Sequence, residues 1–422
     1  MGRIQKIQKP AKLSTLVERF WLFLFILNGG MLFGCAPTNS TYVKSDEQIV
    51  VEQTQLQESN LLDVGIIVFQ GGEISQEQKD NDGITAEIRE AEARYISYHL
   101  RETMQKTSGW GSVSILPSAS EIADVEVSGE IIESDGEDLK LRVYARDSTG
   151  KQWFERTYHT EVSTTDYSDL ESDDDLHEIY QGMYNRIAND LYKYRKNIKP
   201  KQLITIRNTS ELRYAARLAP DIYKEYISEN AAGETSILRL PALNDPSLFR
   251  VHKIREREHL LIDTINEHYG NFYDNAKDPY ANWRKYYLLE TLQKRKIERE
   301  AKLKKTLGGA AVVGSILIAL LGEGFSPGMV VAGVALYRDG SNAAEEAVIH
   351  RAAIIELSQS LQADVQPLVV EVDGEALELT GTLDEQYQQW RVLLKEIYEE
   401  DIGLLSEPDS RTHDSLNRLH DR

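Results

Sequence analysis

The chain has 422 residues, a formal net charge of −20 and a single cysteine. At about 100 to 200 residues per domain, this length predicts two or three domains, each large enough to bury a core of its own. One cysteine excludes an intramolecular disulfide and any zinc module built on several thiolates. The acidic balance argues against nucleic-acid binding, which needs a basic face to neutralise phosphates.

The first 34 residues have the organisation of an export signal. Residues 3–19 carry five basic residues and one acidic residue, and the apolar run Phe20–Leu27 follows them. This run is shorter than the about 20 apolar residues that cross a bilayer as a helix, and Gly29 and Gly30 interrupt it. We therefore expect residues 1–34 to be cleaved off rather than to span the membrane.

The end of this signal resembles the lipobox of bacterial lipoproteins, in the residues Leu32, Phe33, Gly34 and Cys35. In that family a small residue precedes a cysteine that is diacylated on sulfur and becomes the mature N-terminus. The resemblance implies that diacylglycerol and acyl chains on Cys35 attach the protein to membrane lipid; no other cofactor is expected. The alternative is an ordinary signal peptide with a chance cysteine.

The anchor implied by this resemblance sets a location for the protein. At about 0.8 kcal/mol per buried methylene, two or more acyl chains hold a protein stably on a bilayer. Ala36 follows the cysteine where lipoproteins retained at the inner membrane often carry Asp, so the family's sorting pattern implies the outer membrane, with the body facing the periplasm. Removal of residues 1–34 takes five basic residues and one acid from the 48 and 68 of the chain, leaving a net charge of −24.

Residues 35–60, which follow the signal, are mostly polar, with Ile49–Val51 as their one apolar triplet, and they predict a flexible tether. An α+β domain is predicted for residues 62–196, with helices covering one face of a mixed sheet. Apolar residues recurring every three or four positions predict helices at 84–104 and 176–191. Strands are predicted at 62–69, 111–116, 123–133, 138–147 and 151–162. Asp135-Gly136 predicts a hairpin whose two central residues both have positive φ.

Part of this domain resembles a pattern found in known envelope proteins. The residues that carry the resemblance are Ala123–Gly129, Leu139–Asp147, Gly150 and Trp153. They are similar to the TolB amino-terminal domain, the CsgG group of curli-secretion lipoproteins and the lipoprotein activators of penicillin-binding proteins. The resemblance covers residues 62–196 and implies a module that binds proteins in the envelope, with no catalytic residue.

Residues 200–306 predict a helical domain. One or two short helices are expected over 212–227, which Pro220 interrupts, and Asn244-Asp245-Pro246 is a helix-start signal. Two longer helices are expected, over 249–269 and 283–306. The second ends in the basic stretch 294–305, which indicates either a solvated helix face or a contact with lipid head groups.

The next segment, residues 307–337, consists of two uncharged stretches around Gly322-Glu323-Gly324 and predicts a Gly-rich apolar hairpin. Each stretch is too short to span about 30 Å of hydrocarbon as a helix. Two interpretations stay open: a hairpin buried in the protein's own core or in an oligomer interface, or a hairpin that dips into one lipid leaflet. The glycines that would let two helix backbones approach are Gly308, Gly309, Gly314, Gly324, Gly328 and Gly333.

The C-terminal residues 340–405 predict a helix, a small β-hairpin around Asp373-Gly374 and a further helix. Thr382 and Glu385 form a capping box at the start of that helix. The hairpin and helix resemble part of a BON domain, an envelope module that contacts phospholipid or protein. Residues 406–422 are polar and predict a disordered tail.

No pattern in the sequence identifies a catalytic site. Neither G-x-S-x-G nor H-E-x-x-H occurs, and Gly309–Ser315 has the glycine spacing of a phosphate loop without its lysine. His252, Glu256 and His259 lie on one predicted helix face, where they could share a metal. Because alternating charges surround them, exposed salt bridges are the better interpretation, and no metal is expected. The acids Asp173–Asp175 favour a helix start.

These features together predict an α+β outer-membrane lipoprotein that acts as a protein-binding or scaffold module, with an envelope partner that the sequence does not identify. The alternative is an oligomeric subunit of a secretion or transport assembly that uses residues 307–337 at the membrane. A cell-wall enzyme is the third hypothesis. The expected partners are membrane lipid through Cys35, an envelope protein and, in the alternative, further copies of the chain.

Overall fold

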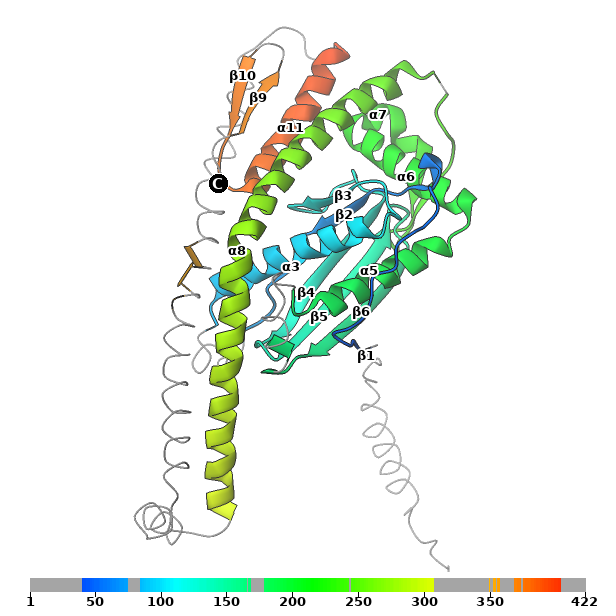
Figure 1. The fold of residues 1–422 in the computed structure, drawn as a ribbon. Coiled ribbons are helices and arrows are strands. Elements are labelled where there is room, and N and C mark those ends of the chain that lie inside the picture. Colours follow the sequence, from blue (N-terminus) through cyan, green and yellow to red (C-terminus); the bar gives the residue numbers. More distant parts are fainter. Residues whose placement is uncertain are drawn as a thin grey trace, which may run out of the picture. The chain divides into compact units, whose positions relative to one another are not determined.

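The computed structural model describes residues 40–74, 84–164, 166–167, 178–242, 244–306, 349, 352–353, 355–356, 368–372 and 375–403 (Figure 1). Helices, one six-stranded mixed sheet and two small hairpins make up the regular structure of this part of the chain, which confirms the predicted α+β class. The predicted signal, the predicted hairpin at 307–337 and the predicted tail at 406–422 lie outside the described residues.

Six strands form the sheet, in the order β1-β6-β5-β4-β2-β3. They are β1 (Ser40–Tyr42), β2 (Val64–Ile67), β3 (Val113–Leu116), β4 (Val125–Ser134), β5 (Asp138–Asp147) and β6 (Gln152–Glu161). Strands β4, β5 and β6 pair antiparallel, whereas β2 runs parallel to both β3 and β4, and β1 runs parallel to β6. Helices α3 (Ala86–Lys106) and α5 (Gln181–Lys196) lie side by side across one face of the sheet (Figure 1).

The hairpin predicted at Asp135-Gly136 is confirmed, but its turn is of another kind. Three residues separate β4 from β5, and only Gly136 has positive φ, at 80°. The Asp135 carboxylate accepts hydrogen bonds from the backbone N–H groups of Glu137 and Asp138, at 3.0 and 2.7 Å. Because the carboxylate supports the longer loop, one glycine in the left-handed region is enough, as in other three-residue hairpin loops.

The predicted flexible tether of residues 35–60 is wrong from residue 40 onward. Strand β1 joins the sheet through β6, and Val43 behind it is only 2% exposed. Asn185 and Asn189 of α5 bind the backbone of residues 47–50, through contacts of 2.7 to 2.8 Å. These partners lie about 140 positions away in the sequence, so the polar composition of the segment gave no sign of them.

The remaining helices of the described chain lie after the sheet in the sequence. They are α6 (Pro200–Leu218), α7 (Pro220–Tyr223), α8 (Pro246–Thr306) and α11 (Leu383–Asp401), with 3₁₀ turns η1 (Glu58–Asn60) and η2 (Lys224–Tyr226). Two small hairpins complete the set: β7 (Ile227–Glu229) with β8 (Thr235–Ile237), and β9 (Leu368–Val372) with β10 (Glu375–Leu379). The capping box at Thr382 and Glu385 is confirmed.

Helix α8 corrects the prediction of two separate helices at 249–269 and 283–306. It runs without a break from Pro246 to Thr306 and passes through Pro279. Its predicted start is confirmed, because the Asp245 carboxylate accepts from the Ser247 backbone N–H at 2.9 Å. The loss of one hydrogen bond at an internal proline is tolerated here, since side chains on both sides of it are packed in the core.

One hydrophobic core joins elements that were predicted as separate domains. Residues such as Leu100 of α3, Leu212 of α6, Leu261 of α8 and Leu394 of α11 belong to the same buried cluster. The predicted divisions at 62–196, 200–306 and 340–405 therefore mark changes of secondary structure within a shared core. A second cluster, between α3 and α8, consists of Ile84, Ile88, Ala91, Tyr95, Phe272, Ala276, Tyr280, Trp283 and Tyr287.

Candidate functional site

The residues predicted to carry function lie outside the described part of the chain. They are the lipobox Leu32, Phe33 and Gly34 with its Cys35, and the glycines Gly308, Gly309, Gly314, Gly324, Gly328 and Gly333. Helix α8 is the described element that leads to the second set, because it ends at Thr306. The contacts that hold α8 therefore fix the position from which residues 307–337 start.

The N-terminal half of α8 is held by the buried carboxylate of Glu258, whose exposed fraction is 0%. It accepts hydrogen bonds from the hydroxyl groups of Tyr214 and Tyr387, both at 2.7 Å, and from the Arg217 guanidinium at 3.0 Å. Tyr214 and Arg217 belong to α6, and Tyr387 belongs to α11. A charge removed from water must be paired, so this carboxylate fixes three helices at one point.

The C-terminal half of α8 is held by a buried ion pair between Arg284 and Glu178. Two guanidinium nitrogens of Arg284 contact the two carboxylate oxygens, one of them at 2.9 Å, and Tyr95 of α3 donates a further hydrogen bond at 2.9 Å. Burial opposes ionisation of Glu178, but the adjacent Arg284 outweighs it and lowers the pKa of Glu178 to about 2. The pair is charged at neutral pH.

A third buried carboxylate, Glu92 of α3, joins the same face. It accepts from the Tyr280 hydroxyl of α8 at 2.6 Å, pairs with Arg89 at 2.6 Å and binds the Ser134 hydroxyl at the end of β4. Between these groups the ring of His99 lies within hydrogen-bond distance of Tyr273 and Gln181. Burial lowers the pKa of His99, which favours a neutral imidazole.

Sequence reasoning missed these charges, although a signal for two of them was present. Glu258 lies four residues from Ile254 on α8, and Arg284 lies four residues from both Tyr280 and Leu288. A charged residue in step with an apolar helix face is predicted to be buried and paired. Their partners on α3, α6 and α11 could not be identified in this way, because no local spacing relates them to α8.

Helix α8 continues to Thr306, directly before residues 307–337. Leu292 packs against the core, and the helix backbone runs on for 14 residues to Thr306. At 1.5 Å per residue these last residues extend over about 21 Å. The basic sequence at 294–305 lies on this part of the helix, directly before residues 307–337.

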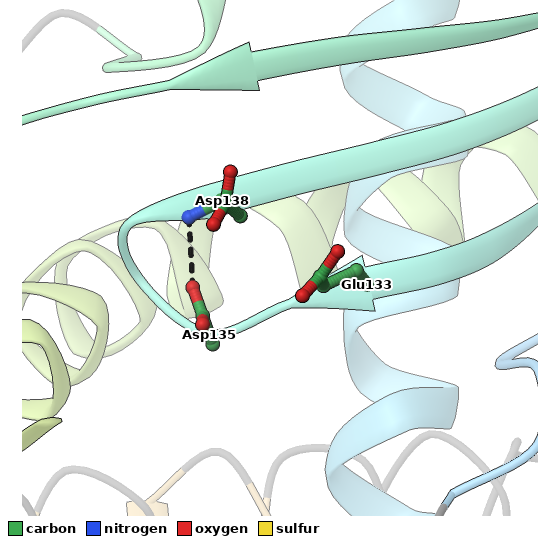
Figure 2. Close-up of side chains that lie close together, drawn as sticks. All are labelled: Glu133, Asp135 and Asp138. Carbon is green, nitrogen blue, oxygen red and sulfur yellow. Dashed lines mark hydrogen bonds between the residues drawn. The ribbon is translucent and has the colours of Figure 1, made fainter. Parts of the chain in front are cut away.

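Three acidic side chains at the β4–β5 turn form the one group with metal-ligand spacing that the described residues contain (Figure 2). The carboxylate oxygens of Glu133, Asp135 and Asp138 lie within 4.8 Å of one another. Each has a partner within the protein: Lys140 for Glu133, His159 at 2.5 Å for Asp138, and backbone N–H groups for Asp135. These contacts account for the cluster as a salt-bridged turn.

The predicted histidine face on α8 forms no metal site in the described structure. His252 contacts Glu211 of α6, and the ligand atoms of His252, Glu256 and His259 do not come together. A cavity of about 10 Å³ lies beside α6, which is room for one water molecule. Its lining residues are Ser120, Glu121, Ala123, Glu126, Asp147, Ser148, Ser210 and Arg213.

Comparison with known proteins found no family model that matches the chain, no similar curated protein and no similar solved structure. The resemblances at residues 62–196 and in the C-terminal region therefore stay predictions. Among the helices that the structure describes, none combines the length and the apolar composition that a membrane span requires.

Proposed function

We propose that this protein is an outer-membrane lipoprotein, held on membrane lipid through Cys35 and facing the periplasm. Its α+β body would act as a protein-binding or scaffold module of the cell envelope. The lipobox resemblance supports the anchor and the location. The proposal assigns no catalytic step, because no acid, base or nucleophile set was identified in the sequence.

The observation that carries the scaffold part of the proposal is the way α8 is fixed. Glu258 and Arg284 lie 26 residues apart on one continuous helix, and each forms hydrogen bonds with buried partners from outside α8. At 1.5 Å per residue, these two points are about 39 Å apart along the helix. A helix held at two such points is a stiff support for whatever residues 307–337 contact.

The same observation supports a second candidate function, as an oligomeric subunit of a secretion or transport assembly. In that case residues 307–337, at the end of α8, would form the contact between copies at the membrane. Sizing of the mature chain without its lipid separates the two functions. A ring-sized oligomer would favour the assembly, and a monomer would favour the binding module.

The anchor is tested by metabolic labelling with a fatty-acid analogue and by membrane fractionation. The wild-type chain should take up the label and fractionate with outer membranes, and Cys35→Ala should lose the label and become soluble. Thr38→Ala, three residues away, is the matched control and should behave as wild type. An unlabelled wild-type chain would show the anchor proposal to be wrong.

A Cys35→Ala chain that loses its label but stays on membranes would show that another segment binds the membrane. Residues 307–337 are then the first to test, and the assembly function gains support. The protein partner is sought by crosslinking and purification of the lipidated protein from its native envelope. The binding module would be supported by an envelope protein that copurifies reproducibly with the wild-type chain and no longer copurifies when the α+β body is unfolded by mutation.

A further inference from the structure

The junction of α5 and α6 carries a run of positive charge in an otherwise acidic chain. Residues 191–210 contain no acid, although the whole chain has 68 acidic and 48 basic residues. The basic residues of this run are Lys193, Arg195, Lys196, Lys199, Lys201 and Arg207.

Four of these residues are exposed: Lys193, Lys196, Lys199 and Lys201, here called the lysine strip. Only Lys196 has an acid nearby, the Glu52 carboxylate at 3.9 Å; within the described residues no ion pair involves the other three. The two arginines have structural roles instead. Arg195 donates to the Asn60 carbonyl and Arg207 to the Glu58 carbonyl.

Helix stability does not account for the strip as a whole. Lys193 and Lys196 lie in the last turn of α5, where a cation interacts favourably with the helix dipole. Lys199 and Lys201 lie at the start of α6, where the dipole disfavours a cation, and the first turn of α6 holds no acid. The helix dipole therefore explains Lys193 and Lys196 but not Lys199 and Lys201.

An exposed apolar pair lies in the segment that runs along α5 toward the lysine strip. Residues 47–60 run along α5, from the contact of Asn185 with residue 47 to that of Arg195 with Asn60. On this path Val50 and Val51 are 48% and 39% exposed. The next contact along the path, of Glu52 with Tyr192 and Lys196, joins it to the lysine strip.

We propose that the lysine strip, together with Val50 and Val51, is a membrane-contact surface that binds anionic phospholipid head groups. Lysines beside exposed apolar side chains are the composition of surfaces that bind at the bilayer interface. The proposal rests on the proposed anchor in one respect. Five residue steps separate Cys35 from Ser40, so the covalent chain allows at most about 18 Å between the anchor and β1.

The net charge of the body does not prevent this contact. At physiological ionic strength the Debye length is about 8 Å, so acidic residues far from the strip are screened from the bilayer. A lysine near an anionic bilayer strengthens binding by about a factor of five, and four lysines act together. A lipid surface fits better than an acidic protein because a lipid anchor would hold the body beside a bilayer permanently.

The test uses the mature full-length chain carrying Cys35→Ala, so that no acyl chain contributes. Its sedimentation with vesicles of phosphatidylglycerol and phosphatidylcholine is compared with that on pure phosphatidylcholine vesicles, at low and high salt. The strip variant changes Lys193, Lys196, Lys199 and Lys201 to Gln. The control variant changes four other exposed lysines to Gln: Lys151, Lys224, Lys253 and Lys277.

The parent chain should bind the anionic vesicles preferentially, and high salt should weaken the binding. The strip variant should bind at least about tenfold more weakly, and the control within about twofold of the parent. Equal loss in both variants, or no loss in the strip variant, would overturn the proposal, as would a parent that does not bind anionic vesicles. Unfolding curves check that all three chains are folded. Because none of them is acylated, failure here is distinct from failure of labelling at Cys35.

Discussion

Single buried carboxylates decide how the helices of this protein are arranged. Glu92, Glu178 and Glu258 each accept at least two hydrogen bonds from side chains of other elements. Removing a carboxylate from water costs several kcal/mol, and charge-assisted hydrogen bonds offset that cost only in a well-defined geometry. These residues therefore specify one packing of α8 more than they add to the free energy of unfolding.

Replacing Glu178 by Gln tests this role directly. The change leaves the buried Arg284 without a countercharge, so we expect the free energy of unfolding to fall by about 3–5 kcal/mol. Urea unfolding at neutral pH measures the effect. Glu225→Gln is the control, since Glu225 is 88% exposed and its pair with Arg239 at 3.9 Å should contribute less than about 1 kcal/mol. Similar losses in the two variants would contradict the buried role of Glu178.

The raised pKa of Asp124 predicts that the free energy of unfolding falls as the pH rises. Burial raises the pKa of this carboxyl from 3.8 to about 6, although its Oδ2 accepts a hydrogen bond from the Asp63 backbone at 3.0 Å. Because the folded state binds the proton more tightly, the stabilisation is complete below about pH 4 and is lost as the pH rises through 6. Asp124→Asn, which keeps an acceptor, should reduce the loss of stability between pH 5 and 7.5 by roughly 1–1.5 kcal/mol.

Two measurements check this prediction. Urea unfolding of both chains at several pH values gives the difference, and a carboxyl titration followed by NMR gives the pKa of Asp124 itself. A wild-type stability that is unchanged relative to Asp124→Asn across this range would show that Asp124 ionises normally in the folded protein.

At the scale of elements, the sequence predicted what local periodicity determines. The strand at 138–147 is confirmed with its exact bounds, and the helix predicted at 84–104 is α3, because apolar alternation and three-to-four spacing reflect burial on one face. The packed path of residues 40–60 and the continuity of α8 through Pro279 were missed. The path of residues 40–60 depends on partners more than a hundred residues away in the chain. The continuity of α8 depends on the packing of side chains around Pro279. A single sequence shows neither.

The contact between the β4–β5 turn and α8 is another such long-range feature, and Gly136 tests it. Gly136 has φ of 80°, and a Cβ added there would lie 2.6 Å from the Arg284 carbonyl oxygen. Gly233 has nearly the same φ, 79°, with open space around it. Both changes to Ala pay for positive φ, about 1 kcal/mol, but only Gly136→Ala must also displace α8.

We therefore expect Gly136→Ala to lower the free energy of unfolding by at least about 2 kcal/mol more than Gly233→Ala. Thermal or urea unfolding of the two variants gives this difference. Equal effects would mean that the turn and α8 do not pack against each other as described.

At the scale of the whole molecule, the sequence predicted functional residues only at Cys35 and in 307–337, which lie outside the described residues. Cys35 and residues 307–337 stand out in the sequence because an export signal and an uncharged tract are local features. The described body is held by pairs such as Tyr387 with Glu258, 129 residues apart, which composition and periodicity cannot reveal. Contacts between residues that lie this far apart in the sequence also join the three predicted domains in one core.

The shared core gives a prediction for the part that was expected to be a domain of its own, residues 62–196. A fragment of residues 40–196 would keep the whole sheet, α3 and α5, but it would lose α8. Glu178 would then lack Arg284, and the edge strand β3 would lose Asn266, whose side-chain amide now binds the backbone of Ile115 at 2.7 and 3.0 Å. An open edge strand beside an exposed apolar surface favours association.

We expect this fragment to bind a hydrophobic dye, to associate and to show no cooperative unfolding in urea, whereas residues 40–403 should unfold in one transition. Near-UV circular dichroism adds a local measurement, since Tyr95 and Trp283 lie in the cluster between α3 and α8 and need a fixed environment to give a signal. A monomeric fragment with a sharp transition would contradict a shared core. It would mean instead that α8 docks on a sheet domain that is already folded, so that the contacts of Glu178 and Glu92 with α8 are free to open without loss of the body.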